Sequence, residues 1–295
     1  IRAPRLSYLI WSHELYNFGH LYESAVAHYQ ATGQNNLLNV AIRNADLLVR
    51  TFLQSDTPNQ SVDGHPEVEN GLLKLWKVTG KPEYLLLVQK LLNLRGDSTT
   101  HPLYLEYDHG KNPYFFQDYK PIKEYDEAYG HGVRALYLYA SMTDMEAYSS
   151  DNAYAEALQK LWNNITKYKM YLTGGIGSRH KGEAFGEKYE LPNAEAYNET
   201  CSSIANILWN HKMFRSTGEG KYMDICERIL YNAFLAGWGQ NGQEYNYVNP
   251  LESDGKYGFN HGKNTRQPWF ETSCCPTNIT RFIPQITQMI YATSG

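Results

Sequence analysis

The sequence predicts an all-α protein made of helical hairpins that close into a toroid. Apolar residues recur at helical spacing over 15–29 and again over 37–52, which is the pattern of amphipathic helices. Helical runs end in Thr-Gly at Gly33, Gly80 and Gly218, and each is followed within a few residues by another helical run. Glycine just past a helix end commonly adopts a left-handed cap, so these sites predict hairpin turns. Because the turns are irregularly spaced, a closed toroid fits better than an open solenoid.

Further helices are expected along the rest of the chain. In order they span 66–78, 82–94, 125–142, 152–169, 201–216, 220–236 and 277–291. Three stretches lack the helical period: 95–124, 171–198 and 238–273. The last of them contains an alternation over 245–250 that predicts a short strand. Loops this long within a compact domain usually carry function, so candidate functional residues are expected there.

Composition sets limits on the class of protein. Of the 295 residues, 42% are hydrophobic and 20% are charged, with a formal net charge of -4, which suits a globular domain and not a polyanion binder. A membrane span needs about 18 consecutive apolar residues, and no apolar run in this sequence approaches that length. Neither nucleic acid nor a membrane is therefore expected as a partner. The 25 Tyr and 6 Trp suit a cleft that grips sugars, or simply a tyrosine-rich helical core.

The ends of the chain leave its compartment open. It begins with Ile1-Arg2, without an initiator Met or the apolar segment of a signal peptide. It stops just after the amphipathic run over 277–291. We therefore expect more protein on one or both sides of this sequence.

Cysteine usage points to thiol or metal chemistry. Four cysteines are too few for a disulfide scaffold in 295 residues, and neighbours such as Cys274 and Cys275 rarely pair without strain. Cys226 lies in a helical run beside Ile225 and Ile229, which predicts core packing. The remaining thiols and one carboxylate make a plausible tetrahedral zinc set: Glu199, Cys201, Cys274 and Cys275. The alternative is that these cysteines are ordinary core residues, since free cysteine is often buried.

The local sequence indicates how these ligands could meet. Residues two apart point to the same side of an extended segment, so Glu199 and Cys201 are expected just before a helix that begins near Ser202. Pro276 is expected to keep Cys275 out of the helical region ahead of the next helix. Both cysteine sites then lie at helix N-termini, where the partial positive charge lowers the pKa of a thiol.

A set of ordered motifs carries a family resemblance. The motifs are Gly130-His131-Gly132, Gly174-Gly175-Ile176-Gly177-Ser178-Arg179-His180, Gly182-Glu183-Ala184-Phe185, Tyr189-Glu190-Leu191-Pro192-Asn193, Glu199-Thr200-Cys201, Tyr247-Val248-Asn249-Pro250 and Cys274-Cys275-Pro276-Thr277-Asn278. In this order and at these spacings, they resemble glycoside hydrolase family 127, the bacterial β-L-arabinofuranosidase family, from about residue 12 to the end. The stretch 124–129 and the residues before Ser12 depart from the family pattern.

The resemblance implies a fold and a metal site. The fold would be an (α/α)6 barrel, with 1–295 as a catalytic domain that lacks some N-terminal residues and the β-sandwich domains that normally follow it. Zinc (Zn2+) would be bound by Glu199, Cys201, Cys274 and Cys275. Among these, Cys274 would be the nucleophile, and Glu183 would be the general acid/base.

The resemblance also implies a sugar pocket. His65, His131 and Tyr247 would line it, and His20 is a further candidate. Each has a plainer explanation, since a lone histidine is more often structural and a strand tyrosine can be ordinary packing. The implied partner is an oligosaccharide or glycoconjugate substrate, with a homodimer as one option for assembly. The bacterial cytoplasm and periplasm are the compartments left open.

The implied activity is that of a zinc-dependent retaining hydrolase that releases β-linked L-arabinofuranose. Most retaining glycosidases use two carboxylates, and here a thiolate would replace one of them. Two alternatives stay open. Toroids of helical hairpins also house sugar epimerases and polysaccharide lyases, which need no thiolate cluster. A carbohydrate-binding helical domain with a structural zinc would carry out no reaction at all.

Overall fold

The structure is a computed structural model that describes residues 4–101, 113–149 and 152–291. Within them the regular structure is helical, and Tyr245 forms only isolated β-bridges, with Trp238 and with Gln267. The all-α prediction is confirmed, whereas the expected strand is reduced to single bridging pairs. The part 102–112 of the expected loop lies outside the described residues. No helix in the described part of the chain is long and apolar enough to cross a membrane.

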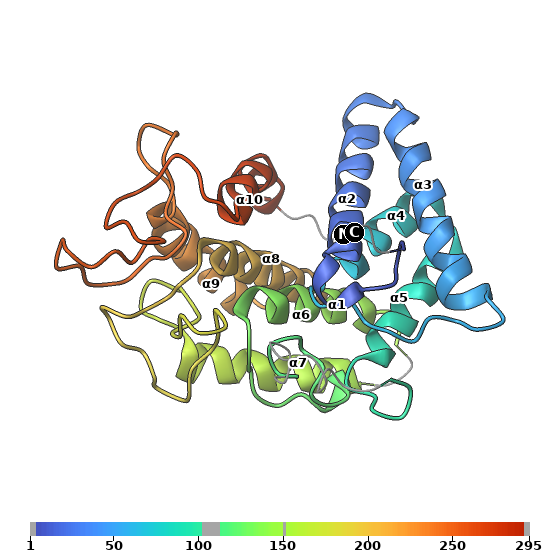
Figure 1. The fold of residues 1–295 in the computed structure, drawn as a ribbon, viewed down its shortest axis with the longest axis horizontal. Helices are drawn as coiled ribbons and strands as arrows, with labels where there is room; N and C mark the ends of the chain where they lie inside the picture. The colour runs from blue at the N-terminus through green and yellow to red at the C-terminus, as the bar shows by residue number, and fades with distance from the viewer. Residues whose placement is uncertain (1–3, 102–112, 150–151, 292–295) are drawn as a thin grey trace. The chain divides into compact units, whose positions relative to one another are not determined.

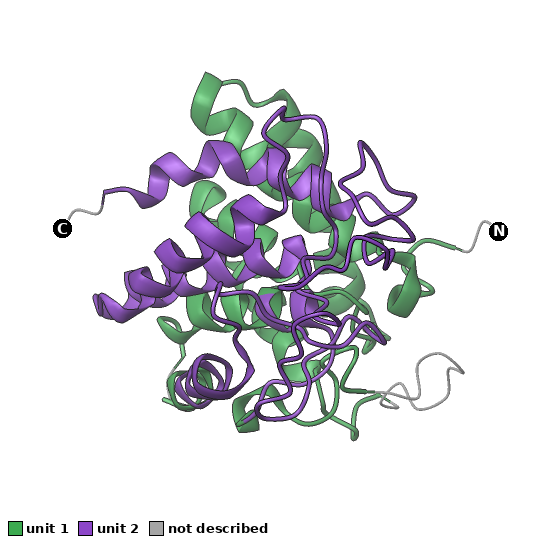
Figure 2. Ribbon diagram, turned by 90° about the vertical axis from the view of Figure 1, so that its left-hand side faces the viewer, with its two compact units in different colours: residues 1–126, 137–158 green, residues 127–136, 159–295 purple. Residues whose placement is uncertain are grey.

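The helices form two compact units, which Figure 2 shows in separate colours. The first unit comprises residues 1–126 and 137–158, and the second comprises residues 127–136 and 159–295. Helices α6 (Gly132–Glu146) and α7 (Ala153–Asn164) contribute residues to both units. That the whole chain is one catalytic domain stays a prediction.

The first unit is built on two helical hairpins (Figure 1). Its elements are α1 (Leu9–Ser12), α2 (Glu14–Thr32), α3 (Asn36–Val49) with the π-helix η1 (Arg50–Gln54), α4 (Val68–Thr79), α5 (Pro82–Leu94) and the 3-10 helix η2 (Ile122–Glu124). Helices α2 and α3 form one hairpin, α4 and α5 form the other, and α2 packs against α4. The packing of α2 on α4 requires glycine, because a Cβ on Gly71 would overlap the backbone of Gly19.

The second unit contains two long loops and the helices that follow them. Its elements are the π-helix η3 (Ile165–Lys169), α8 (Thr200–Thr217), α9 (Lys221–Ile229) with the π-helix η4 (Leu230–Phe234), and α10 (Cys274–Phe282) with the 3-10 helix η5 (Ile283–Met289). Helix α8 packs against both α9 and α10. Their apolar faces meet in a core that includes Ile229, Ile279 and Phe282. Cys226 is buried in this core, as predicted, and its thiol donates to the Ile207 carbonyl.

The Thr-Gly turns predicted from the sequence end three helices in the same way. Each glycine adopts a left-handed conformation, with φ of 72° at Gly33, 68° at Gly80 and 73° at Gly218. Its N–H donates to the carbonyl four residues earlier, at 2.8, 2.8 and 2.7 Å respectively. The hydroxyl of the preceding threonine donates to the carbonyl four residues before that threonine. It also accepts the N–H of the residue that follows the glycine. The turn therefore satisfies carbonyls that a helix end leaves open.

The helix predicted over 125–142 begins later, at the glycine after His131. The residues before it are held by side chains from further along the chain. The Ala128 N–H donates to Asn164 Oδ1 at 3.0 Å, and the Ala128 carbonyl accepts from the buried Lys169 ammonium at 2.8 Å. Because these contacts satisfy the backbone without a helix, α6 starts only where the ring of His131 can cap it.

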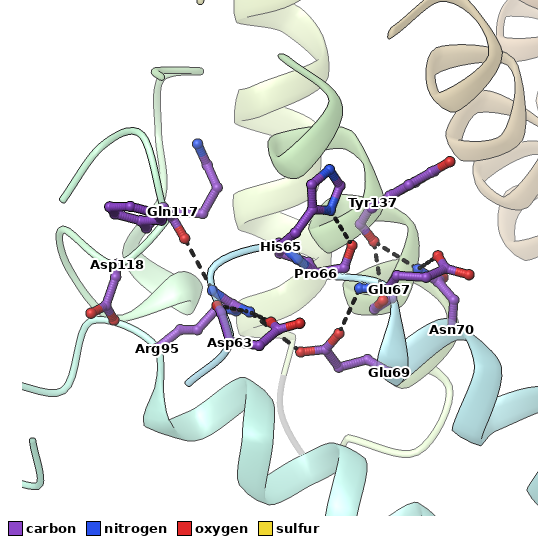
Figure 3. Close-up of polar contacts among 12 residues, drawn as sticks. Asp63, His65, Pro66, Glu67, Glu69, Asn70, Arg95, Gln117, Asp118 and Tyr137 are labelled. Atoms are coloured by element: carbon purple, nitrogen blue, oxygen red, sulfur yellow. Dashed lines mark hydrogen bonds and ion pairs between the residues drawn. The ribbon is translucent and has the colours of Figure 1, made fainter. Parts of the chain in front are cut away.

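A buried ion-pair network holds the chain ahead of α4 in the first unit (Figure 3). The Arg95 side chain is 1% exposed and donates to Asp63 twice, to its carboxylate at 2.8 Å and to its carbonyl at 3.1 Å. It also lies 3.7 Å from Glu69, whose other carboxylate oxygen accepts the Glu67 N–H at 3.2 Å. The guanidinium thus links the residues on either side of His65. Buried carboxylates need such a partner because the loss of hydration disfavours an isolated charge.

Replacing Arg95 with methionine should destabilise the first unit, because two buried carboxylates lose this cation. We expect the free energy of unfolding to fall by about 3–5 kcal/mol, measured by denaturant unfolding at neutral pH. Arg43→Met, at an exposed position on α3, is the matched control and should change that free energy by less than about 0.5 kcal/mol. Equal effects of the two substitutions would contradict the role assigned to the network.

Candidate metal centre and active site

Helix α8 begins with two of the candidate ligands. Glu199 is its N-cap, with an extended backbone (φ -60°, ψ 137°), and Cys201 is the second helical residue. The helix starts at Thr200, earlier than expected, so the prediction of an extended segment through Cys201 is wrong. The start is held by Asn249, whose side-chain amide donates to the Asn198 carbonyl at 2.8 Å and to the Thr200 hydroxyl at 3.0 Å.

Helix α10 begins with the paired cysteines. Cys274 and Cys275 are its first two residues, and Pro276 is the third. The expectation that Pro276 keeps Cys275 out of the helical region is therefore wrong. Proline is tolerated in a first turn because the N–H groups there have no helical partner. The prediction that both cysteine sites lie at helix N-termini is confirmed.

These two helix starts bring four groups together, termed the Glu-Cys cluster: Glu199, Cys201, Cys274 and Cys275. Their donor atoms all lie within 4.8 Å of one another. The sulfur of Cys275 is 3.3 Å from that of Cys201 and 3.9 Å from that of Cys274. Glu199 Oε1 is 3.6 Å from the Cys274 sulfur and 3.7 Å from the Cys275 sulfur. Cys274 is partly exposed, and the other three residues are buried.

Without a cation, these four acidic groups cannot all be ionised in one buried site. Hydrogen bonds from the Cys201 and Cys275 thiols lower the pKa of Cys274 to about 3, against the effect of burial. The Tyr247 hydroxyl forms a hydrogen bond of 3.0 Å with the same sulfur and lowers the pKa of Cys274 further. Burial raises the pKa of Cys201, Cys275 and Glu199 well above their usual values. The negative charge is therefore concentrated on the partly exposed thiol.

The donor set fits a metal ion. The second carboxylate oxygen of Glu199 is buried and has no hydrogen-bond partner among the described residues, which leaves its lone pairs for a cation. A tetrahedral zinc with Zn–S bonds of about 2.3 Å places its sulfur ligands about 3.8 Å apart. The Cys275 sulfur lies 3.3 Å from the Cys201 sulfur and 3.9 Å from the Cys274 sulfur, close to that spacing. The Glu-Cys cluster can therefore hold a metal ion.

Glu183 and His131 form a second feature beside the cluster. His131 Nδ1 accepts the N–H groups of Val133 and Arg134 at 3.2 and 3.4 Å, so the ring caps α6. The other ring nitrogen then carries the proton and donates to Glu183 Oε2 at 2.6 Å. Donor atoms of His131, Glu183 and Glu199 also lie within 4.8 Å of one another. The Glu183 carboxylate thus adjoins the Glu-Cys cluster.

Glu183 is held as a carboxylate by hydrogen bonds. Its Oε1 accepts from the Tyr197 hydroxyl at 2.7 Å, and its side chain stays 29% exposed. Burial raises the pKa of Glu183, but the hydrogen bonds from His131 and Tyr197 more than offset it and bring the pKa to about 2. The residue has a left-handed φ of 50°, a conformation that costs about 1–3 kcal/mol for a side chain of this kind. Such strain is found mostly where a side chain has a fixed task.

Tyr247 is placed by the loop over 238–273. Its N–H donates to Asn260 Oδ1 at 2.8 Å, and its carbonyl accepts the Thr200 N–H at 3.0 Å. The loop is thereby tied to the first residue of α8. This tie places the Tyr247 hydroxyl against the Cys274 sulfur.

The remaining two candidates, His20 and His65, belong to the first unit. His20 Nδ1 lies 3.2 Å from a Glu67 carboxylate oxygen. His65 is buried, and its Nδ1 lies 3.1 Å from the Pro66 carbonyl (Figure 3). The Tyr16 ring contacts both histidines, with centroids 4.5 Å from His20 and 4.4 Å from His65. Their part in a sugar pocket stays a prediction.

Sequence reasoning missed the residues that support the site. Tyr197 holds Glu183, while Asn249 and Asn260 fix the loop behind the cluster. Tyr197 lies two residues before Glu199, so attention to the flanks of that motif could have found it. Asn249 lies inside the Tyr247-to-Pro250 motif but was given no role, and Asn260 lies in a polar loop where no periodic pattern marks it.

Comparison with known proteins gives the class. The model of the β-L-arabinofuranosidase GH127 catalytic domain matches residues 3–288. The helical fold is thus that of a glycoside hydrolase catalytic domain. The chain belongs to glycoside hydrolase family 127. The resemblance seen in the motifs is therefore confirmed.

Three relatives show how far the likeness extends. The chain is 37% identical over 302 residues to the non-reducing end β-L-arabinofuranosidase of Bifidobacterium longum subsp. longum, covering 98% of the chain and 46% of that protein. It is 42% identical to the solved GH127 β-arabinofuranosidase BT3674, with a TM-score of 0.87 over 99% of the chain and 43% of the other. It is 39% identical to Ara127N-Se, a GH127 β-L-arabinofuranosidase from Geobacillus stearothermophilus T6. That match has a TM-score of 0.90 and covers 98% of this chain and 48% of the other. The chain therefore spans about half the length of these relatives.

The fold is also found outside the family. The cellobiose 2-epimerase of Spirochaeta thermophila DSM 6192 matches 94% of the chain at 12% identity, with a TM-score of 0.54. At that identity the likeness shows the fold alone. The predicted (α/α)-barrel class is confirmed, and the epimerase alternative gains no support as a function.

Loss of a cluster thiol should weaken metal binding. We expect Cys201→Ala to bind a divalent metal more than about tenfold more weakly, because one of four ligands is removed. The metal content of the purified, dialysed protein measures this. Cys226→Ala removes a buried thiol outside the cluster and should retain the full content. Equal metal contents in the two variants would contradict a metal centre at the cluster.

Metal binding should also weaken steeply as the pH falls. Cys201, Cys275 and Glu199 have raised pKa values without a cation, so an ion must displace more than one proton to bind them. The affinity should fall by more than about tenfold per unit between about pH 7.5 and about pH 6, measured by competition with a chelator. A weaker dependence would mean that these ligands are already ionised in the free site.

Proposed function

We propose that the protein is a zinc-dependent retaining glycosidase that releases β-linked L-arabinofuranose, with Cys274 as nucleophile and Glu183 as general acid/base. The observation that carries the proposal is the Cys274 thiol. It is partly exposed, and its ionised form is stabilised by the Cys201 and Cys275 thiols and the Tyr247 hydroxyl. The cluster around it adjoins the Glu183 carboxylate. A nucleophile and a proton donor near one bond are what two-step glycoside hydrolysis needs.

In the first step, the Cys274 thiolate attacks the anomeric carbon while Glu183 delivers a proton to the departing oxygen. The C–S bond forms as the C–O bond breaks, and the aglycone leaves as an alcohol. The low pKa of Cys274 keeps the nucleophile ionised near neutral pH. A bound sugar that removes water from the exposed edge of Glu183 favours the protonated carboxyl that this step requires.

In the second step, Glu183 takes a proton from water, and the water oxygen attacks the same carbon. The C–S bond breaks, and its electron pair returns to Cys274. Two displacements at one carbon retain its configuration. The hydrogen bonds from His131 and Tyr197 hold the carboxylate in one place for both steps.

The metal is proposed to be zinc, bound by Glu199, Cys201, Cys274 and Cys275. When bound, zinc would keep the thiols ionised and stabilise sulfur as a leaving group. Structural zinc sites are closed, and the partial exposure of Cys274 therefore favours a catalytic site. This exposure argues against the alternative of a carbohydrate-binding domain with a structural zinc.

The sugar is inferred from the relatives. The Bifidobacterium protein is a non-reducing end β-L-arabinofuranosidase, and the Geobacillus protein is a β-L-arabinofuranosidase. We therefore infer an oligosaccharide or glycoconjugate substrate that ends in β-L-arabinofuranose. His131 and Tyr247, beside the reacting groups, would contact this sugar. A sugar-binding role for His20 and His65 stays a prediction. A homodimer and a bacterial cytoplasmic or periplasmic location stay predictions.

Cys274→Ser should keep part of the metal and lose nearly all turnover. A serine hydroxyl is not ionised near neutral pH, so the nucleophile is lost while three ligands remain. We expect kcat to fall by about a thousandfold or more, measured as sugar released from an aryl β-L-arabinofuranoside.

Two comparisons complete this test. Cys226→Ala, in the core of the second unit, should hydrolyse the same substrate at the wild-type rate. Wild-type rates in Cys274→Ser would show that another group is the nucleophile. Activity of the unmodified protein that survives exhaustive chelation would favour an epimerase or lyase mechanism that needs no thiolate cluster.

A further inference from the structure

An arc of aromatic rings in the second unit connects both reacting groups with exposed side chains. Its members, in the order of their contacts, are Tyr257, His180, Tyr197, Tyr247 and His261. Successive ring centroids lie 6.5, 5.0, 6.3 and 4.4 Å apart. The two inner rings contact the reacting groups through their hydroxyls, Tyr197 on Glu183 and Tyr247 on Cys274. The three outer rings have no part in the mechanism described above.

One of the outer rings, His180, belongs to the turn that carries the acid/base residue. His180 is on the same tight turn as Glu183, whose N–H donates to the His180 carbonyl at 3.1 Å. Burial lowers the pKa of His180, and His261 is near enough for its charge to lower it further. Tyr257 is 52% exposed, and His261 is exposed as well. A molecule that extends from Glu183 over His180 toward solvent would therefore meet Tyr257, whose ring contacts that of His180.

His180 also offers a polar atom that the protein does not use. Its Nε2 is buried and has no hydrogen-bond partner in the described part of the chain. Buried polar atoms are nearly always satisfied in proteins, so an unsatisfied one beside a reacting group suggests a ligand partner. Imidazole can donate to or accept from a hydroxyl, depending on its tautomer.

We propose that Tyr257, His180 and His261 form the subsite that binds the aglycone sugar of the proposed oligosaccharide substrate. The inference rests on the proposed function, because protonation by Glu183 requires the glycosidic oxygen within about 2.6–3.2 Å of its carboxylate. The leaving group begins at that oxygen, beside His180. Sugar rings pack their C–H faces on aromatic rings, and their hydroxyls can bond the unused imidazole nitrogen.

Charge in this region favours a neutral aglycone. Arg179 precedes His180 in the chain, but its guanidinium is engaged with Glu190, with Nε to carboxylate oxygen at 2.6 Å. An acidic leaving group would have to compete with Glu190 for this cation. An uncharged ring with several hydroxyls is therefore the better match.

The test compares two substrates whose leaving groups are both alkanols: a β-linked arabinofuranosyl disaccharide and methyl β-L-arabinofuranoside. In the full chain, Tyr257→Ala should lower the ratio of kcat/KM for the disaccharide over the methyl glycoside by about three- to tenfold. The loss should fall mainly on KM for the disaccharide. Tyr257→Phe keeps the ring and should restore the ratio. Tyr231→Ala, at another exposed tyrosine, should leave the ratio at its wild-type value.

The outcomes separate the two proposals. An unchanged ratio in Tyr257→Ala would overturn the subsite and leave the proposed hydrolysis standing. An equal loss of the ratio in Tyr231→Ala would also overturn the subsite, since the effect would not belong to the arc. A wild-type protein that hydrolyses neither glycoside would overturn the proposed function, and the subsite with it.

Discussion

The meeting of three thiols and a carboxylate at one point, all buried except the partly exposed Cys274, is the constraint on which the rest of this structure depends. All four groups are acidic, and a buried cluster tolerates little net negative charge without a cation. The metal-free site meets this condition by ionising Cys274 and keeping protons on Cys201 and Cys275. A divalent ion would meet it by neutralising the cluster. The ionisation of the partly exposed Cys274 thiol therefore depends on the hydrogen bonds that the Cys201 and Cys275 thiols donate to it.

The helices position the ligands, and the loops supply the groups around them. Helices α8 and α10 both begin at cluster residues, so the partial positive charges of two N-termini lie at the site of greatest negative charge. The loops over 171–198 and 238–273 have little regular structure and are held by side-chain amides such as those of Asn249 and Asn260.

Periodicity predicted the helices well, because each buries a continuous apolar stripe, and the Thr-Gly signals marked three of their ends. The helix starts were harder to predict. Glu199 is not a usual N-cap residue, and the Ser273 hydroxyl donates to the Phe270 carbonyl instead of capping α10. Cys201 and Cys275 lie inside the first turns of their helices. The late start of α6 depends on bonds between residues 36 and 41 positions apart in the chain, which no local pattern reveals. Residue types alone suggest the ligand set but leave core packing of the cysteines open, and the family motifs favour the metal site.

Helix α6 and the Glu183 carboxylate are joined through the ring of His131. Two backbone N–H groups point at its Nδ1, so a second proton there would meet donors where it needs an acceptor. Burial lowers the pKa of this imidazole as well. The ring is confined to one tautomer and cannot act as a relay that gains a proton at one nitrogen and releases one from the other. In the proposed mechanism, proton exchange with substrate and water would therefore rest on the Glu183 carboxyl group and not on His131.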